Sequence, residues 1–278
     1  MTQAIQKKLN DSAFARWTAL ILVALTMFFG YMFVDVLSPL QNMLESTRGW
    51  SPTIFGLYGG SEFILNVCGF LLVAGIILDK MGVRFTGILS ASLMVLGAGI
   101  KFYGLSNYFY EGGFGYEFLS SFLTDIPASA KLACLGFMVF GCGTEMAGVT
   151  VSRAIVKWFT GKELALAMGL EMAIARLGVF AVFSLSPWVA NWGGDPSVAR
   201  PVAVVGLLLC IGLLTYIAFS VMDFKLDRQT EADTPIGETE EPFKVADLKN
   251  LFSSKTFLIV SALCVLYYSA IFPFQRFA

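Results

Sequence analysis

Seven separate stretches of this sequence are long and apolar enough to cross a lipid bilayer. A spanning helix needs about 20 mostly apolar residues, because an α-helix rises about 1.5 Å per residue and the hydrocarbon core is about 30 Å thick. Lipid offers no partners for backbone N–H and C=O groups, so such stretches must be helical. The seven predicted spans are Trp17–Leu37, Thr53–Leu78, Phe85–Leu105, Lys131–Phe159, Glu163–Ala190, Val198–Met222 and Thr256–Phe277.

The composition agrees with a lipid environment. Of the 278 residues, 56% are hydrophobic and 14% are charged, whereas soluble domains carry about 25% charged residues. The net charge of -1 gives no basic field that would recruit nucleic acid. The chain has no histidine, which removes histidine metal sites and Ser-His or Cys-His nucleophile pairs. We therefore expect no cofactor, no metal, no nucleic-acid partner and no enzyme; the expected partners are the lipid bilayer and a small-molecule substrate.

Lysine and arginine fall mainly on one side of the predicted spans. With a cytoplasmic N-terminus, the inner segments hold twelve of them and the outer segments hold four, namely Arg48, Lys101, Lys131 and Arg200. Cytoplasmic loops carry an excess of these residues. The N-terminus is therefore predicted to be cytoplasmic, and we expect a bacterial inner (plasma) membrane.

The order of spans and linkers predicts four parts. A cytoplasmic segment, 1–16, precedes six spans in 17–222; a polar, acidic connector, 223–255, then leads to the last span, 256–278. Six spans followed by a long connector are typical of one half of a carrier built from 3+3 inverted repeats. We expect an all-α membrane protein, a six-helix bundle plus a seventh helix, truncated from a twelve-helix carrier. The missing C-terminal half of that polypeptide is then a further expected partner.

A charged motif with two glycines follows the second predicted span. Gly75 allows close helix contact, and Gly82 permits a tight turn. Asp79, Lys80 and Arg84 form a charge cluster that can bind neighbouring helix ends and hold one bundle against the other. The alternative is an ordinary cytoplasmic turn with basic residues.

This G-x-x-x-D-[KR]-x-G-x-R pattern resembles the loop signature of the major facilitator superfamily, with Ile77 where leucine is usual. Trp50-Ser51-Pro52, before the second span, is similar to the start of that helix in the family. Lys157–Leu170 resembles the family's inner connection, especially in the branch of lysosomal dipeptide carriers. The resemblance covers residues 17–278 and implies a secondary transporter that works by alternating access.

Ionisable side chains inside membrane spans cost about 2.5–3.5 kcal/mol each on insertion scales, so they are functional candidates. Two of them, Glu145 and Arg176, lie roughly 18 and 21 Å from the inner surface at 1.5 Å per residue, close to mid-membrane. We predict that Arg176 binds the carboxylate and Glu145 the ammonium of a zwitterion. The resemblance implies the same roles, since both occupy the places of the residues that bind the two peptide termini in the dipeptide branch. The alternative is a structural ion pair.

Five more residues complete the expected binding site. Glu62 is a candidate proton carrier or second ammonium contact, with Asn66 one turn away, although a packing acid is the alternative. Asp35 either lines the outer cavity or is a helix-end acid at the interface. Tyr31 and Tyr58 are candidate cavity aromatics.

Arg153 and Glu171 lie closer to the cytoplasmic end of their spans. Their depths differ by roughly 7 Å, which a long arginine side chain can bridge. We expect them to form a structural or gating pair.

The sequence thus predicts a symporter or uniporter for a small zwitterion, such as a dipeptide or an amino-acid-like compound. One alternative keeps the fold and moves an organic or inorganic anion, such as a carboxylate or nitrate, with Arg176 and Arg153 as its ligands. A different class, a seven-helix receptor, is disfavoured because the N-terminus is predicted to be cytoplasmic.

Overall fold

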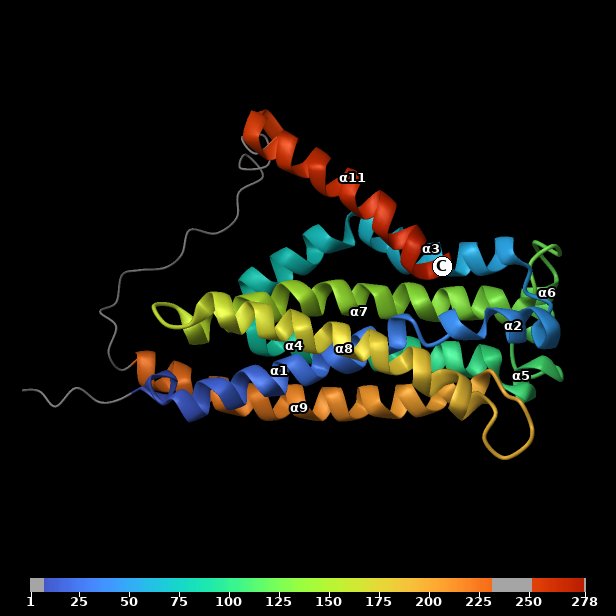
Figure 1. Ribbon diagram of the computed structural model, residues 1–278, viewed down its shortest axis with the longest axis horizontal. Helices are drawn as coiled ribbons and strands as arrows, with labels where there is room; N and C mark the ends of the chain where they lie inside the picture. Colours follow the sequence, from blue (N-terminus) through green and yellow to red (C-terminus); the bar gives the residue numbers. More distant parts are fainter. Residues whose placement is uncertain (1–7, 232–251, 278) are drawn as a thin grey trace, which may run out of the picture. The chain divides into compact units, whose positions relative to one another are not determined.

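A computed structural model describes residues 8–231 and 252–277, and all regular structure in these residues is helical. The chain forms two compact units, Met1–Thr234 and Pro235–Ala278. In the first unit the long helices run side by side along one direction (Figure 1). The described part of the second unit contains one long helix, α11 (Lys255–Phe277).

The long helices of the first unit are apolar and are joined by short turns or by small helices. They are α1 (Ala13–Val34), α3 (Pro52–Leu65), α4 (Leu71–Leu105), α7 (Ala128–Phe159), α8 (Leu164–Ala190) and α9 (Ala199–Glu231). The small elements are η1 (Leu9–Asp11), η2 (Ser38–Leu40), α2 (Gln41–Arg48), the π-helical η3 (Asn66–Phe70), α5 (Asn107–Tyr110) and α6 (Tyr116–Ser120).

One apolar stretch, Pro52–Leu105, is long enough for two membrane crossings. Its 54 residues would reach about 80 Å as a single helix at 1.5 Å per residue. Gly82 interrupts α4 with φ 74° and ψ 174°, a conformation that glycine adopts without a steric cost. The ribbon turns back along the bundle after this point (Figure 1). The four other apolar stretches of this unit supply one crossing each, so the six predicted crossings are present.

The contacts between these crossings have the pattern expected of a 3+3 repeat. Helix α1 packs against α8 and α9, α7 packs against α3 and α4, and α4 packs against α9. If the first three crossings are exchanged with the last three, the α1–α8 contact corresponds to α7–α3 and the α1–α9 contact to α7–α4. The α4–α9 contact corresponds to itself. The bundle therefore has the internal symmetry that a half-carrier requires.

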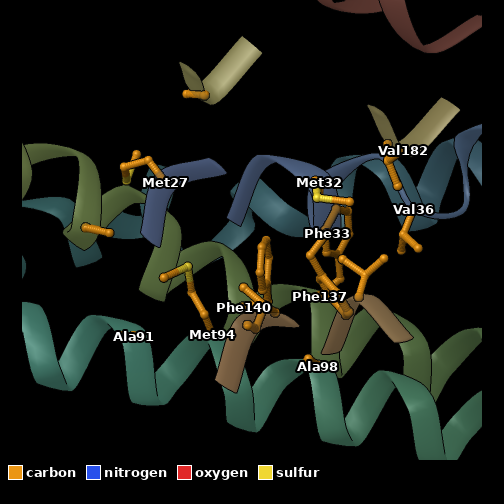
Figure 2. Packing of buried hydrophobic residues seen from close by; sticks show 14 of the residues in the cluster. Met27, Met32, Phe33, Val36, Ala91, Met94, Ala98, Phe137, Phe140 and Val182 are labelled. Carbon is orange, nitrogen blue, oxygen red and sulfur yellow. The ribbon is translucent and has the colours of Figure 1, made fainter. Parts of the chain in front are cut away.

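Large aromatic side chains fill the centre of the bundle between α1, α4 and α7 (Figure 2). The ring centroids of Phe33 and Phe140 lie 4.8 Å apart, and those of Phe137 and Phe140 lie 5.9 Å apart. Met94 and Ala98 of α4 pack against the same core. Because lipid is as apolar as these side chains, such close packing, rather than hydrophobic burial, holds membrane helices together.

Helix α9 extends beyond the predicted end of the bundle at residue 222. Asp223, expected at the start of the connector, is 1% exposed. Lys157 Nζ and Trp158 Nε1 donate hydrogen bonds to its two carboxylate oxygens, at 2.8 and 2.9 Å. Residue 223 therefore belongs to the bundle, whereas 232–251 of the predicted connector lie outside the described residues.

The N-terminal segment is tied to the same end of the bundle by an N-terminal clamp, formed by Asp11, Arg16, Lys162 and Glu163. Arg16 pairs with Glu163 at 3.1 Å, and Lys162 with Asp11 at 3.0 Å. The Lys162 ammonium and the Lys8 backbone N–H hold the pKa of the Asp11 carboxyl below its usual value. A lowered pKa means that this contribution is present above about pH 4 and is lost as the pH falls through the folded-state value.

We predict that Gly141→Ala destabilises the bundle. A Cβ at Gly141 would lie 2.1 Å from the carbonyl oxygen of Glu62, so α3 and α7 must move apart, at a cost of about 2 kcal/mol. Thermal unfolding of the detergent-solubilised protein should show a clearly lower midpoint. The added Cβ of Gly148→Ala, on the same helix, meets no described residue within 4 Å, so this variant serves as the control. Equal midpoints for the two variants would contradict this packing.

We also predict that Asp223→Ala lowers stability by about 3 kcal/mol, because it removes one member of a buried, hydrogen-bonded ion pair. Asp227→Ala is the matched control: Asp227 also pairs with Lys157, but its side chain is 27% exposed. Its loss should cost about 1 kcal/mol or less. Thermal unfolding of the two variants measures these losses of stability. Similar losses would show that the burial of Asp223 does not strengthen its ion pair.

Candidate functional site

Charged residues from three helices meet around Tyr31 of α1. The Arg176 guanidinium of α8 lies 5.3 Å from the centre of the Tyr31 ring. Tyr31 is also within electrostatic range of Glu62 on α3, Glu145 on α7 and Glu171 on α8. The fold thus brings one arginine and three acids to one tyrosine. We call these five residues the Tyr31 site.

Neither Glu145 nor Arg176 takes part in a salt bridge with another described residue. Glu145 is half-buried, and Arg176 is exposed on the bundle. The alternative of a structural ion pair between these two residues is therefore wrong within the described residues. Both charges remain open to a ligand.

Glu62 is buried in the bundle, and its backbone lies close to α7. Its side chain is 3% exposed, and Gly141 lets α7 approach its carbonyl oxygen. Asn66 Nδ2 donates to the carbonyl oxygens of Glu62 and Gly141, both at 3.3 Å. Asn66 thus joins α3 to α7 at the start of η3, and its amide nitrogen serves packing rather than a ligand.

Two residues expected to line the cavity lie elsewhere. Asp35 is the C-cap residue of α1 and accepts a hydrogen bond from Ser38 Oγ at 3.0 Å, so it is a helix-end acid. Tyr58 is 2% exposed, and its ring stacks on Phe137 with centroids 4.7 Å apart. The expectation that Tyr58 lines the cavity is wrong, because the ring belongs to the packed core.

The expected pair of Arg153 with Glu171 is not formed. Arg153 pairs instead with Asp79, at the turn after the second crossing. Glu171 is buried and takes part in no salt bridge with a described residue. The two residues are separated because Arg153 reaches toward the end of the bundle, whereas Glu171 lies with Tyr31.

The rest of the loop motif ties helices of one bundle together. Arg84 pairs with Asp227 of α9 at 3.3 Å, and Gly82 makes the predicted turn. Lys80 is exposed and forms no ion pair with a described residue. Gly75 was expected at a close helix contact, but a Cβ there would meet nothing within 4 Å among the described residues.

Sequence reasoning missed Lys101, the most deeply buried cation among residues 8–231 and 252–277. The charge count treats Lys101 as an outer-loop residue, which is wrong, because its side chain is 0% exposed. Its ammonium lies among the rings of Phe33, Tyr58 and Phe137. Lys101 falls inside the predicted span Phe85–Leu105, so the rule that ionisable residues within spans are functional candidates would have selected it.

Two further features bear on cofactors and ligands. No group of three or more Cys, Asp or Glu side chains that could hold a metal ion occurs in the described residues. A groove of about 730 Å³ lies between α4, α6 and α7, with Gly99, Tyr103 and Phe118 among its lining residues. No charged residue lines it, so this groove is separate from the Tyr31 site.

Comparison with known proteins identifies the family. The profile of the Major Facilitator Superfamily matches residues 20–277. The lysosomal dipeptide transporter MFSD1 of Gallus gallus is 35% identical over 145 residues, 50% of this chain and 32% of the relative. The protein of the same name from Danio rerio is 36% identical over 146 residues, 50% of this chain and 31% of the relative.

A longer alignment is found with the lysosomal dipeptide transporter MFSD1 of Pongo abelii. It is 27% identical over 271 residues, 93% of this chain and 52% of the relative. The chain therefore spans about half the length of this relative. The names of these relatives include the lysosome, whereas a bacterial plasma membrane and a cytoplasmic N-terminus stay predictions for this chain. Since the family profile covers nearly the whole sequence, this multi-pass membrane protein belongs to the major facilitator superfamily.

Proposed function

We propose that this chain forms part of a secondary active or facilitative transporter for a small zwitterion, with a dipeptide as the favoured cargo. The observation that carries this proposal is the Tyr31 site, where Glu145 and Arg176 carry opposite charges and form no salt bridge with the described residues. The relatives named as dipeptide transporters support the same cargo.

The chemistry of the two residues fits the two ends of a peptide. A guanidinium presents parallel N–H donors that match a carboxylate, and a glutamate accepts hydrogen bonds from an ammonium. The Tyr31 ring lies against the Arg176 guanidinium, and this cation–π contact restricts the directions in which the guanidinium can turn. Tyr31 therefore orients the group that takes the carboxylate.

Transport would follow from the position of this site within half a carrier. Two bundles that rock around a central site expose it to each side of the membrane in turn. In the described bundle, the pairs Asp79–Arg153 and Arg84–Asp227 join α4 to α7 and α9 at one end, so this bundle would move as one body. Glu62 is the candidate proton carrier for a symporter; a uniporter needs none.

The charges at the site disfavour the anion alternative. Three acids and one arginine lie within electrostatic range of Tyr31, and this excess of negative charge repels an anionic cargo. Arg153, the second arginine that this alternative needs, is paired with Asp79. A zwitterion brings an ammonium to the acids, whereas a dicarboxylate does not.

We predict that Glu145→Gln and Arg176→Gln each raise the half-saturation concentration for a dipeptide at least about 20-fold, because each removes a charge-assisted contact of about 2 kcal/mol. Uptake of a labelled dipeptide would be measured in proteoliposomes with the full-length protein that contains this chain. Glu117→Gln, an exposed acid on α6, should leave uptake unchanged.

Blocked peptides assign the two ends. An N-acetylated dipeptide lacks the ammonium, so Glu145→Gln should not weaken its already poor uptake further, whereas Arg176→Gln should. A dipeptide amide should show the reverse. Undiminished uptake of the unmodified dipeptide by both variants would remove this pair from the binding site.

We also predict that free dipeptides inhibit labelled uptake and that a dicarboxylate at the same concentration does not, because the acids around Tyr31 repel a second negative charge. A competition assay in the same proteoliposomes measures this. Inhibition by the dicarboxylate alone would favour the anion carrier instead.

A further inference from the structure

Lys101 of α4 is a buried cation that the proposed binding chemistry does not use. Its Nζ lies 4.3 Å from the ring centre of Phe33, 4.5 Å from that of Phe137 and 5.0 Å from that of Tyr58. An ammonium within about 6 Å of a ring face is attracted by the negative face of the ring. We call these three rings the aromatic cage; they come from α1, α7 and α3.

The aromatic cage is packed into the core. Phe33 and Phe137 are fully buried and lie close together between α1 and α4 (Figure 2). Tyr58 stacks on Phe137 and also contacts Trp50, with centroids 5.5 Å apart. Trp50 Nε1 donates to Ser129 Oγ at 3.0 Å. A substrate cannot reach Lys101 in this state, so any effect of its charge on transport must pass through the helices.

Each helix that supplies a ring also supplies a residue of the Tyr31 site. Phe33 follows Tyr31 by two positions on α1, and Tyr58 precedes Glu62 by one turn on α3. Phe137 precedes Glu145 by eight positions on α7, or about 12 Å at 1.5 Å per residue. A helix is rigid over such short distances. The position of each ring therefore sets the position of the neighbouring site residue.

The charge of Lys101, rather than the volume of its side chain, explains this arrangement. A buried ammonium is costly to remove from water, and an unbranched apolar residue of similar length would fill the same space without that cost. The chain instead surrounds the ammonium with three ring faces from three helices. The ammonium adds cation–π attraction toward all three helices to the packing that a neutral side chain would also provide.

We propose that Lys101 is a positioning residue: its ammonium, bound in the aromatic cage, fixes α1, α3 and α7 so that Tyr31, Glu62 and Glu145 face Arg176. This inference rests on the proposed role of the Tyr31 site in binding a zwitterion. It adds a residue that contacts no substrate and yet sets the affinity for it.

Lys101→Met and Lys101→Arg test the proposal in the full-length protein. Loss of the cation–π contacts in Lys101→Met should raise the half-saturation concentration for a dipeptide about tenfold and change the maximal rate less than about twofold. Lys101→Arg keeps the charge and should remain within about threefold of the unsubstituted protein. Lys131→Met is the control, because Lys131 lies over the Phe122 ring at 4.6 Å but belongs to the loop end of α7.

Two results would overturn the proposal. One is an unchanged half-saturation concentration in Lys101→Met; the other is equal impairment of Lys101→Met and Lys101→Arg, which would show that the side chain only fills space. If Lys101→Met does not reach the membrane, Phe137→Leu removes one ring and keeps the lysine. It should raise the half-saturation concentration about threefold, and no rise would count equally against the cage.

A readout without substrate separates this proposal from the proposed function. Tyr31→Cys, in a protein whose five native cysteines are replaced by serine, would be labelled with a water-soluble thiol reagent. Adding Lys101→Met should change the labelling rate at this position several-fold and leave the rate at a Glu117→Cys control, exposed on α6 outside the membrane spans, unchanged. Equal rates at Tyr31→Cys would refute the positioning role even if dipeptides are transported. If dipeptides are not transported, a changed rate would still support it.

Discussion

The bilayer core offers no hydrogen-bond partner to a polar group, and the arrangement of charges in this bundle depends on that constraint. Asp223 accepts hydrogen bonds from Lys157 and Trp158, and the Lys101 ammonium lies against three aromatic rings. These charges hold the protein together. Glu145 and Arg176 differ, because neither has a salt-bridge partner among the described residues. A zwitterionic ligand would provide a salt-bridge partner for each of these two residues. This difference from Asp223 and Lys101 is the physical basis for proposing the binding site there.

Close packing and the candidate site are built from the same residues. Gly141 lets α7 approach the backbone of Glu62, and Asn66 donates hydrogen bonds to the backbones of both α3 and α7 at this point. The aromatic cage surrounds Lys101, and its rings lie two, four and eight positions along their helices from Tyr31, Glu62 and Glu145. Interhelical packing in lipid therefore determines where the site charges lie, and a change in the core reaches the site through rigid helices.

The charged residues discussed above fall into two groups by their place along the bundle. Asp79, Arg84, Arg153 and Asp227 pair with one another at the end that carries the loop motif. These pairs join α4 to α7 and to α9 at this end. The charges around Tyr31 lie away from these pairs and are predominantly acidic. A carrier that rocks as a body needs both: paired charges that keep the bundle rigid, and charges that a solute can engage, such as Glu145 and Arg176, which form no salt bridge with a described residue.

The crossings, the turn at Gly82 and the family could all be predicted from the amino-acid sequence, because span length is set by bilayer thickness and a left-handed turn favours glycine. It also selected Glu145 and Arg176, since a charge inside a span is costly wherever it lies. Which charges meet became visible only in the folded bundle. Residue spacing in the sequence predicts how deep a side chain lies along its helix. It does not fix how the helix is rotated about its axis, or which neighbouring helix the side chain contacts. Arg153 therefore pairs with Asp79 rather than Glu171, Tyr58 packs in the core, and Lys101 turns inward to three rings instead of outward to water.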